Sequence, residues 1–425
     1  MPTRRQLLQS LAAPAIVPAS ALGLNGAVPP SDRVTLATIG VGWMGGSHVD
    51  EFLKCSGLQY VALADLDDHR LTENKAKIDG FYGDQGCAAY HAFEEVLARR
   101  DIDAVSIAVP DHWHGIVAVL AARAGKDIYC EKPIAQNFNE GLKMVQAAQK
   151  YGRIWQTGSW QRSKENFRQG CELVRNGAIG KVHTIEVGLP GGHTDFAKTK
   201  DKTQVTKPPA WLWYDRWLGP APEAPYCEAR VHKNWRWNYD YAGGQLMDWV
   251  GHHVDIAHWG MGFDETGPSE VEGAGEFPPR EALYNTATKY KVTCKYPQGV
   301  TMVIAGGYKE IRGGTKWIGD KGWLWVNRGK IEASDPALLT ADLKPAIPYP
   351  KSPGHYQEYI DSVKSRRRTL TPAEVALRSA TPGFLGNISM FTGRKLRWDA
   401  AKMEIVGDAE AARLLGREMR SPWRL

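Results

Sequence analysis

The sequence lacks the features that several classes of protein require. Its 425 residues include only six cysteines, with no CxxC pair and no Cys/His cluster at zinc spacing. We interpret these cysteines as scattered thiols, and we expect neither a disulfide framework nor a metal site. A long basic stripe is also missing: the net charge is +6, and the single tight run, residues 366–368, is typical of a solvated helix end. We therefore expect no nucleic-acid partner.

The N-terminal segment has too little apolar sequence to cross a bilayer. Residues 1–21 combine Arg4 and Arg5, a short stretch broken by prolines, and a small-residue end at 19–21. This pattern predicts a twin-arginine-like signal peptide, although a disordered basic leader is the alternative. No cysteine follows it, so we expect no stable membrane anchor. The prediction is export by the twin-arginine machinery to the periplasm or medium, with residues 22–33 as a linker or arm.

The remaining composition is that of an ordinary globular protein. Apolar residues make up 43% of the chain and charged residues 24%. The length favours two domains. We place a dinucleotide-binding domain at 34–155 and a substrate-binding and oligomerisation domain at 156–425, whose last helices are candidates to pack back on the first domain.

The first domain opens with a glycine-rich turn. A buried strand predicted over 34–39 runs into Gly40-Val41-Gly42-Trp43-Met44-Gly45, which has the pattern GxGxxG at a strand-to-helix junction. Gly40 permits the tight turn, Gly42 lets a pyrophosphate approach the backbone, and Gly45 lets helix and strand pack closely. The predicted cofactor contacts of this turn are Gly40, Gly42, Trp43, Met44 and Gly45.

An acidic residue follows the next predicted strand. The strand at 60–64 ends at Asp65, about 20 residues after Gly45, where an acid binds the ribose hydroxyls of a dinucleotide. Its charge would repel a 2′-phosphate, so we expect NAD rather than NADP. Alternatively, Asp65 only caps the turn to the next helix, and Asp67 or Asp68 takes the ribose.

Strands and helices continue to alternate, which predicts a doubly wound parallel sheet with ligands at the carboxyl ends of its strands. The strand at 104–109 leads to residues 110–114, and the strand at 127–130 leads to residues 131–133. Lys132 is placed to bind a nicotinamide ribose and to stabilise an alkoxide; an exposed turn ion pair is the alternative. Pro133 would fix the direction of this lysine, and a cis bond before the proline is one way to do so. The cofactor contacts predicted here are Pro110, His112, His114, Glu131 and Lys132.

A second cluster of polar residues lies at 243–255. Asp248, His252 and Asp255 are spaced i, i+4 and i+7, which predicts one face of a helix. A histidine beside a carboxylate is a general base near neutral pH. The alternative is a helix cap with satisfied core groups; a metal is disfavoured because only one of the two histidines lies on this face.

Tryptophan is abundant in the middle of the chain, with seven of the sixteen between residues 211 and 259. Flat aromatic rings suit a saccharide pocket, although core packing or an oligomer interface is the alternative. We include Trp235 and Arg162 with Asp248 and His252 as candidate substrate contacts; for Arg162, which follows another short predicted strand, a carboxylate partner is the alternative.

In their order along the chain, the glycine turn, Asp111-His112-Trp113-His114, Glu131-Lys132-Pro133 and the Asp248–His252 segment resemble the glucose–fructose oxidoreductase / inositol dehydrogenase / rhizopine-catabolism (Gfo/Idh/MocA) family. The resemblance implies a second α+β domain with a large, open, mostly antiparallel sheet that often pairs subunits, and hence a homo-oligomer. It also implies that Lys132, Asp248 and His252 are catalytic.

In the scheme that the resemblance implies, His252 accepts a hydroxyl proton, Lys132 stabilises the oxyanion, Asp248 orients the histidine or binds a hydroxyl, and a hydride passes to the nicotinamide. We expect a sugar, polyol or glycoside oxidoreductase with a retained cofactor. A redox-neutral glycoside-cleaving enzyme and a non-catalytic binding protein are the alternatives. An insertion at about 193–240 departs from the family pattern and leaves the substrate open.

Overall fold

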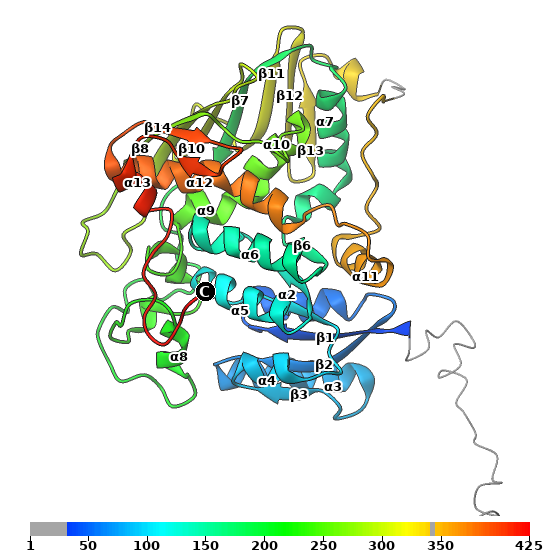
Figure 1. Ribbon diagram of the computed structural model, residues 1–425, viewed down its shortest axis with the longest axis vertical. Coiled ribbons are helices and arrows are strands. Elements are labelled where there is room, and N and C mark those ends of the chain that lie inside the picture. Colours follow the sequence, from blue (N-terminus) through cyan, green and yellow to red (C-terminus); the bar gives the residue numbers. More distant parts are fainter. Residues whose placement is uncertain (1–31, 341–344) are drawn as a thin grey trace, which may run out of the picture.

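The computed structural model describes residues 32–340 and 345–425; the predicted signal peptide lies outside them. Figure 1 shows two sheets at opposite ends of the molecule, with α6 (Phe138–Lys150), α9 (Gly244–Trp249) and α12 (Ala373–Thr392) between them. Within the described ranges, no helix is both long and apolar enough to cross a membrane. All six cysteines are free thiols.

The first sheet has the predicted doubly wound, parallel arrangement. Its strand order is β3-β2-β1-β4-β5-β6, and every pairing is parallel. The central strands β1 and β4 are buried along almost their whole length, as expected of a parallel sheet that helices cover on both faces. The strands are β1 (Val34–Ile39), β2 (Leu58–Ala64), β3 (Ala88–Tyr90), β4 (Ala104–Ile107), β5 (Asp127–Cys130) and β6 (Trp155–Thr157), and the connecting helices are α2 (Trp43–Phe52), α3 (Asp68–Tyr82), α4 (Phe93–Ala98), α5 (Asp111–Arg123) and α6.

The second sheet has nine strands in the order β13-β12-β11-β7-β10-β9-β8-β14-β15. Only the β7–β10 pairing is parallel, which confirms the mostly antiparallel sheet. The strands are β7 (Val182–Leu189), β8 (Glu270–Glu276), β9 (Lys289–Lys295), β10 (Thr301–Gly306), β11 (Gly314–Gly319), β12 (Gly322–Asn327), β13 (Lys330–Ala333), β14 (Leu396–Asp399) and β15 (Glu404–Ile405), and helices α7 (Glu165–Arg175), α10 (Asp255–Met261) and α12 pack against this sheet.

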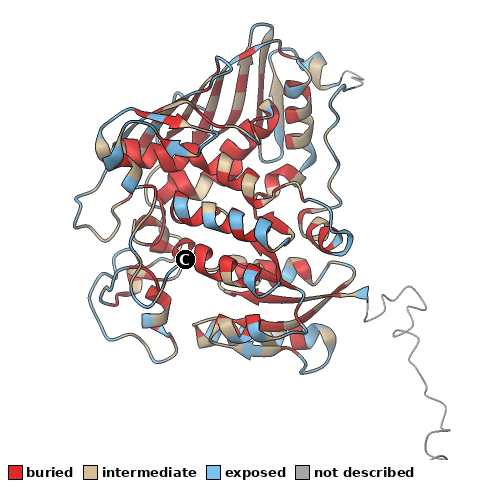
Figure 2. Ribbon diagram, in the orientation of Figure 1, coloured by how far each residue is buried: buried red, intermediate tan, exposed pale blue. Residues whose placement is uncertain are grey.

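One hydrophobic core joins the two halves. Figure 2 shows buried residues continuing from the first sheet through α5, α6 and α12 to the second sheet. Helix α11 (His355–Ser365) returns to the first domain, where Tyr359 and Ile360 pack in the cluster that contains Val34, Phe52 and Tyr129. The elements that carry the site therefore rest on a continuous core.

The insertion at 193–240 has a small core of its own and lies over the carboxyl edge of the first sheet. This core includes Leu212, Trp217 and Trp235, and its one α-helix is α8 (Tyr214–Leu218). Its backbone bonds the loop that follows β2: Trp213 N donates to Leu66 O at 3.0 Å, and Asp68 N donates to Trp211 O at 3.0 Å. The insertion is thus joined to the region where the predicted ribose-binding acid lies.

Candidate active site

The three glycines of the turn between β1 and α2 meet three different constraints. Gly40 has a φ of +82°, and a side chain there would overlap the backbone of Ala108. A Cβ on Gly45 would overlap the carbonyl oxygen of Gly40, so this glycine permits the close approach of helix and strand. A Cβ on Gly42 would meet only the guanidinium of Arg70, at 3.2 Å, on the pocket side. Gly42 therefore leaves open the space through which a pyrophosphate approaches the backbone.

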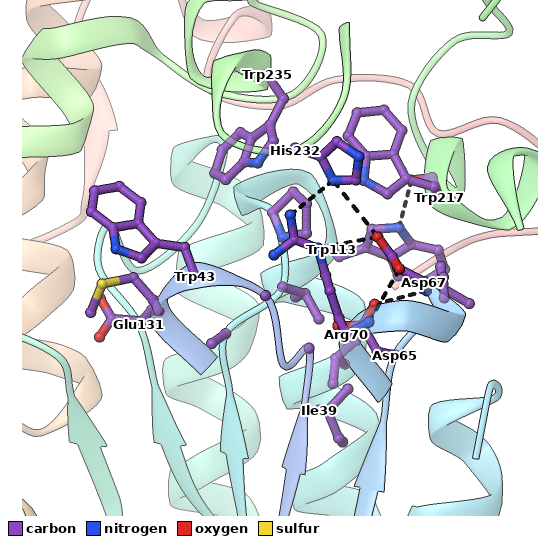
Figure 3. A pocket seen from close by; sticks show the side chains of 18 of the residues that line it. Ile39, Trp43, Asp65, Asp67, Arg70, Trp113, Glu131, Trp217, His232 and Trp235 are labelled. Atoms are coloured by element: carbon purple, nitrogen blue, oxygen red, sulfur yellow. Dashed lines mark hydrogen bonds and ion pairs between the residues drawn. The ribbon is translucent and has the colours of Figure 1, made fainter. Parts of the chain in front are cut away.

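A pocket lies over this turn and extends to the ends of β4 and β5 (Figure 3). Most of the predicted cofactor contacts line it: Gly40, Gly42, Trp43, Met44, Asp65, Pro110, His114, Glu131 and Lys132. Gly45 does not line it, in keeping with its packing role. His112 does not either: its imidazole is fully buried and its Nε2 lies 2.9 Å from the carbonyl oxygen of Trp217. The prediction that His112 contacts the cofactor is therefore wrong, because this side chain holds the insertion instead.

Asp65 is fixed by backbone amides of the turn and of its own loop. Its Oδ2 accepts from Val41 N at 2.6 Å, and its Oδ1 accepts from Asp67 N at 2.9 Å. Burial raises the pKa of this carboxyl, and the two amides oppose that rise. A carboxylate has further acceptor capacity, so Asp65 can still accept from a ribose hydroxyl. The helix-cap role belongs to Asp67, whose Oδ1 accepts from the amides of His69 and Arg70.

The turn that carries Lys132 is supported by a buried chain of polar groups. Oε1 of Glu131 lies 2.9 Å from Nε2 of His48, whose Nδ1 lies 2.8 Å from Ser106 Oγ. Oε2 of Glu131 accepts from Lys132 N at 3.1 Å. Burial acts against ionisation of Glu131, but His48 and Lys132 hold its pKa below the ordinary value. The peptide bond between Lys132 and Pro133 is cis.

Lys132 reaches across to the second domain. Its Nζ donates to Asp248 Oδ1 at 2.9 Å and to Asp248 O at 2.8 Å. The same Oδ1 accepts from Arg236 Nε, at 3.2 Å, so one carboxylate lies between two cations. Burial opposes ionisation of Asp248, but these two charges outweigh it and lower the pKa. Asp248 therefore binds Lys132 and Arg236, and no hydrogen bond from it to His252 is present in the described structure.

His252 lies one turn after Asp248, on a single π-helical turn formed by Val250–Val254. Its ring packs edge-on against Trp160 and Trp249, with centroid separations of 6.1 and 5.4 Å. Burial, followed by the charges of Lys132 and Arg328, lowers the pKa of His252 well below its usual value. The imidazole is therefore neutral near pH 7, and its Nδ1 has no hydrogen-bond partner among the described residues.

The prediction that Asp255 shares a face with Asp248 and His252 is wrong. The π turn accommodates an extra residue and changes the phase of the helix that follows. Asp255 instead binds Arg162, with its Oδ2 2.8 Å from Nε and its Oδ1 2.9 Å from Nη2. The second partner of Arg162 is Asp264, 2.8 Å from Nη2. Arg162 is 1% exposed and does not line the pocket; of its two predicted roles, contact with a carboxylate partner is the one that the structure shows.

The motifs missed four cationic side chains of the pocket: Arg70 from α3, and Arg216, Lys233 and Arg236 from the insertion. No spacing rule identifies them, and the only available signal was the richness of the insertion in lysine and tryptophan. Trp235, predicted to contact substrate, lines the same pocket, with the guanidinium of Arg236 4.4 Å from its ring centroid. The insertion therefore contributes side chains to both the nucleotide pocket and the Lys132–Asp248 pair.

Comparison with protein families gives two matches that together cover nearly all of the described chain. Residues 34–159 match the NAD-binding Rossmann fold of the Gfo/Idh/MocA oxidoreductase family, and residues 163–425 match its C-terminal alpha/beta domain.

Individual proteins show the same likeness. The chain is 29% identical over 152 residues to myo-inositol 2-dehydrogenase of Thermotoga maritima, which is 36% of this chain and 44% of that protein. It is 30% identical over 130 residues to a glycosyl hydrolase family 109 protein of Solibacter usitatus, which is 28% of each chain. Each match thus spans less than half of the relative. The aldose–aldose oxidoreductase from Caulobacter crescentus has a similar fold, with a TM-score of 0.63 and 20% identity over 86% of this chain and 99% of that chain.

Proposed function

The chain belongs to the Gfo/Idh/MocA oxidoreductase family, and from this premise we propose that it transfers a hydride between a bound nicotinamide cofactor and a hydroxyl-bearing carbon of a sugar, polyol or glycoside. The observation that carries the proposal is the position of Lys132. It lines the nucleotide pocket and also binds Asp248, one turn before His252. At the end of the pocket, the ammonium of Lys132 lies close enough to His252 for their charges to interact, although His252 itself is buried and does not line the pocket.

A nicotinamide bound at this end would supply the hydride acceptor. Lys132 then stabilises the negative charge that develops on the substrate oxygen, because its ammonium is held by Asp248 at 2.9 Å and is only partly exposed. His252 is the group proposed to take the hydroxyl proton, because its ring is neutral and its Nδ1 makes no hydrogen bond within the described residues. Asp248 positions Lys132. Glu131 and His48 hold the turn that carries Lys132.

We infer that the cofactor is NAD and that it stays bound between turnovers. The carboxylate of Asp65 at the end of β2 disfavours a 2′-phosphate. We infer retention because the twin-arginine-like segment predicts export, and free NAD is scarce outside the cytoplasm. A second sugar would then regenerate the cofactor, and the aldose–aldose oxidoreductase with the same fold supports such an exchange between two sugars.

The test uses the protein as purified. Mass spectrometry of the small molecules released on denaturation should find NAD, and a screen of sugars and glycosides should change the nicotinamide absorbance. A protein that neither contains nor takes up a dinucleotide contradicts the proposal.

A second candidate is redox-neutral glycoside cleavage, in which the sugar is transiently oxidised, the aglycone eliminated and the sugar reduced again. The partial match to a glycosyl hydrolase family 109 protein favours it. Nitrophenyl glycosides separate the two: release of nitrophenol with no net change in NADH supports cleavage, whereas net reduction of the cofactor supports the dehydrogenase.

A further inference from the structure

The glycine turn is surrounded by cationic side chains that the Rossmann fingerprint does not supply. Nη1 of Arg70 lies 3.2 Å from the position that a Cβ on Gly42 would occupy. The Nζ of Lys233 lies 4.6 Å, and the Cζ of Arg236 5.7 Å, from the ring centroid of Trp43, the residue after Gly42. Arg70 thus lies over the backbone of Gly42, Lys233 and Arg236 lie against the ring of the next residue, and all three line the pocket over the turn whose amides would receive a diphosphate.

These cations are incompletely neutralised by the protein. Among residues 32–340 and 345–425, no carboxylate lies within ion-pair distance of Lys233. Arg70 uses Nε for Asp67, at 3.2 Å, and its Nη1 faces Gly42. Arg236 uses Nε for Asp248 and Nη1 for Lys233 O. Each side chain therefore keeps at least one N–H group for a further anionic acceptor.

The insertion is fixed in the position that presents these charges. His232 has a φ of +56°, a conformation that non-glycine residues rarely adopt, and its neighbours hold it there. Its ring stacks on Trp211 at 6.2 Å and 17°, and its Nδ1 lies 3.2 Å from Nη2 of Arg70. Figure 3 shows His232 and Trp235 reaching down from the insertion toward Trp43 and Arg70.

We propose that Arg70, Lys233 and Arg236 form a phosphate clamp that closes over the diphosphate of the dinucleotide, and that the insertion slows release of the cofactor. This inference rests on the proposed function. Two of the three clamp residues come from the insertion, which backbone hydrogen bonds join to the loop after β2. The diphosphate is the ligand chemistry that fits, because its oxygens accept several charge-assisted hydrogen bonds at once.

The experiment measures the rate of NADH release from the full-length protein. The protein is loaded with NADH, an excess of ADP-ribose is added as the trap, and loss of bound NADH is followed by fluorescence. The test variant is Lys233→Met, which removes the charge and keeps an apolar stem over Trp43. The matched control is Lys207→Met, an exposed lysine of the same insertion that does not line the pocket.

The clamp predicts that Lys233→Met releases NADH about tenfold faster than the parent. A tenfold change is the effect expected from the loss of roughly one hydrogen bond to a charged group. Lys207→Met should release NADH at the parent rate. Added salt should accelerate release from the parent more than from Lys233→Met, because screening acts on the charge that the variant lacks.

Release from Lys233→Met within twofold of the parent rate, or an equal acceleration in Lys207→Met, would overturn the clamp. Failure of the parent protein to bind NADH at any concentration is a different result, because it contradicts the proposed function itself.

Discussion

Replacement of Lys132 by methionine should abolish most of the activity while leaving the fold nearly intact. The methionine keeps an unbranched side chain of similar length and removes only the ammonium. Its loss takes away the donor for the developing alkoxide, so we expect kcat to fall by about 10²–10³-fold, the effect of removing one preorganised donor from an oxyanion site.

The small cost in stability follows from the partner that remains. Removing one member of a buried ion pair costs about 3–5 kcal/mol when the other charge is left alone. Asp248 is not left alone in this variant, because Arg236 Nε lies 3.2 Å from the same Oδ1. We therefore expect a loss of only about 1 kcal/mol in the free energy of unfolding, the value of an ordinary hydrogen bond. The double variant Lys132→Met/Arg236→Met should lose more than the sum of the two single changes, because only then is Asp248 unpaired.

Three measurements on each variant test this reasoning: kcat from nicotinamide absorbance, denaturant unfolding, and the amount of bound dinucleotide. The control is Lys309→Met, an exposed lysine outside the pocket, which should match the parent in all three. The reasoning is refuted if Lys132→Met keeps kcat within a few-fold of the parent, or if the single change alone costs more than 3 kcal/mol.

Three further predictions concern residues around the site. Arg162→Met should lower the free energy of unfolding by about 3–5 kcal/mol without changing KM, because it leaves Asp255 buried and unpaired. Burial lowers the pKa of His355 to about 3, so the stability it contributes is present above pH 6.5 and lost as pH falls. When the pH falls from 7 to 5, the free energy of unfolding should therefore fall by about 2 kcal/mol less in His355→Gln than in the parent, as measured by denaturant unfolding. Gly45→Ala should weaken NADH binding at least tenfold in a fluorescence titration, since its Cβ overlaps the carbonyl of Gly40.

Each of these predictions has an outcome that contradicts it. A stable Arg162→Met protein with a raised KM would mean that Arg162 contacts the substrate. Parallel stability curves for His355→Gln and the parent would mean that this ring is not held neutral by burial. Unchanged NADH affinity in Gly45→Ala would show that the turn tolerates a side chain where the helix and strand meet.

The nucleotide-binding half of the fold was predictable because its signals are local. The strand at Val34–Ile39 is a run of apolar and β-branched residues, and the GxGxxG turn follows it directly; both lie where the sequence indicated. Lys132 was predictable for the same reason, since it follows a short buried strand at the ligand edge of a parallel sheet.

The errors arose where the outcome depends on tertiary contacts or on a local departure from regular geometry. An i, i+4, i+7 spacing assumes an unbroken α-helix, and the π turn at Val250–Val254 turned Asp255 toward Arg162. His112 follows a strand at the ligand edge as Lys132 does, but the insertion covers it and accepts its hydrogen bond. Arg236 could not be foreseen, because 12 residues and an irregular loop separate it from Asp248.

The central claim is that a hydride passes from a sugar carbon to a dinucleotide held over the glycine turn. The most direct test incubates the purified protein with a ring-deuterated glycoside or sugar that it converts, stops the reaction during turnover, and determines the mass of the released cofactor. The account predicts that the reduced nicotinamide carries one deuterium. Conversion of the substrate with no deuterium on the cofactor, or with no cofactor present, would contradict it.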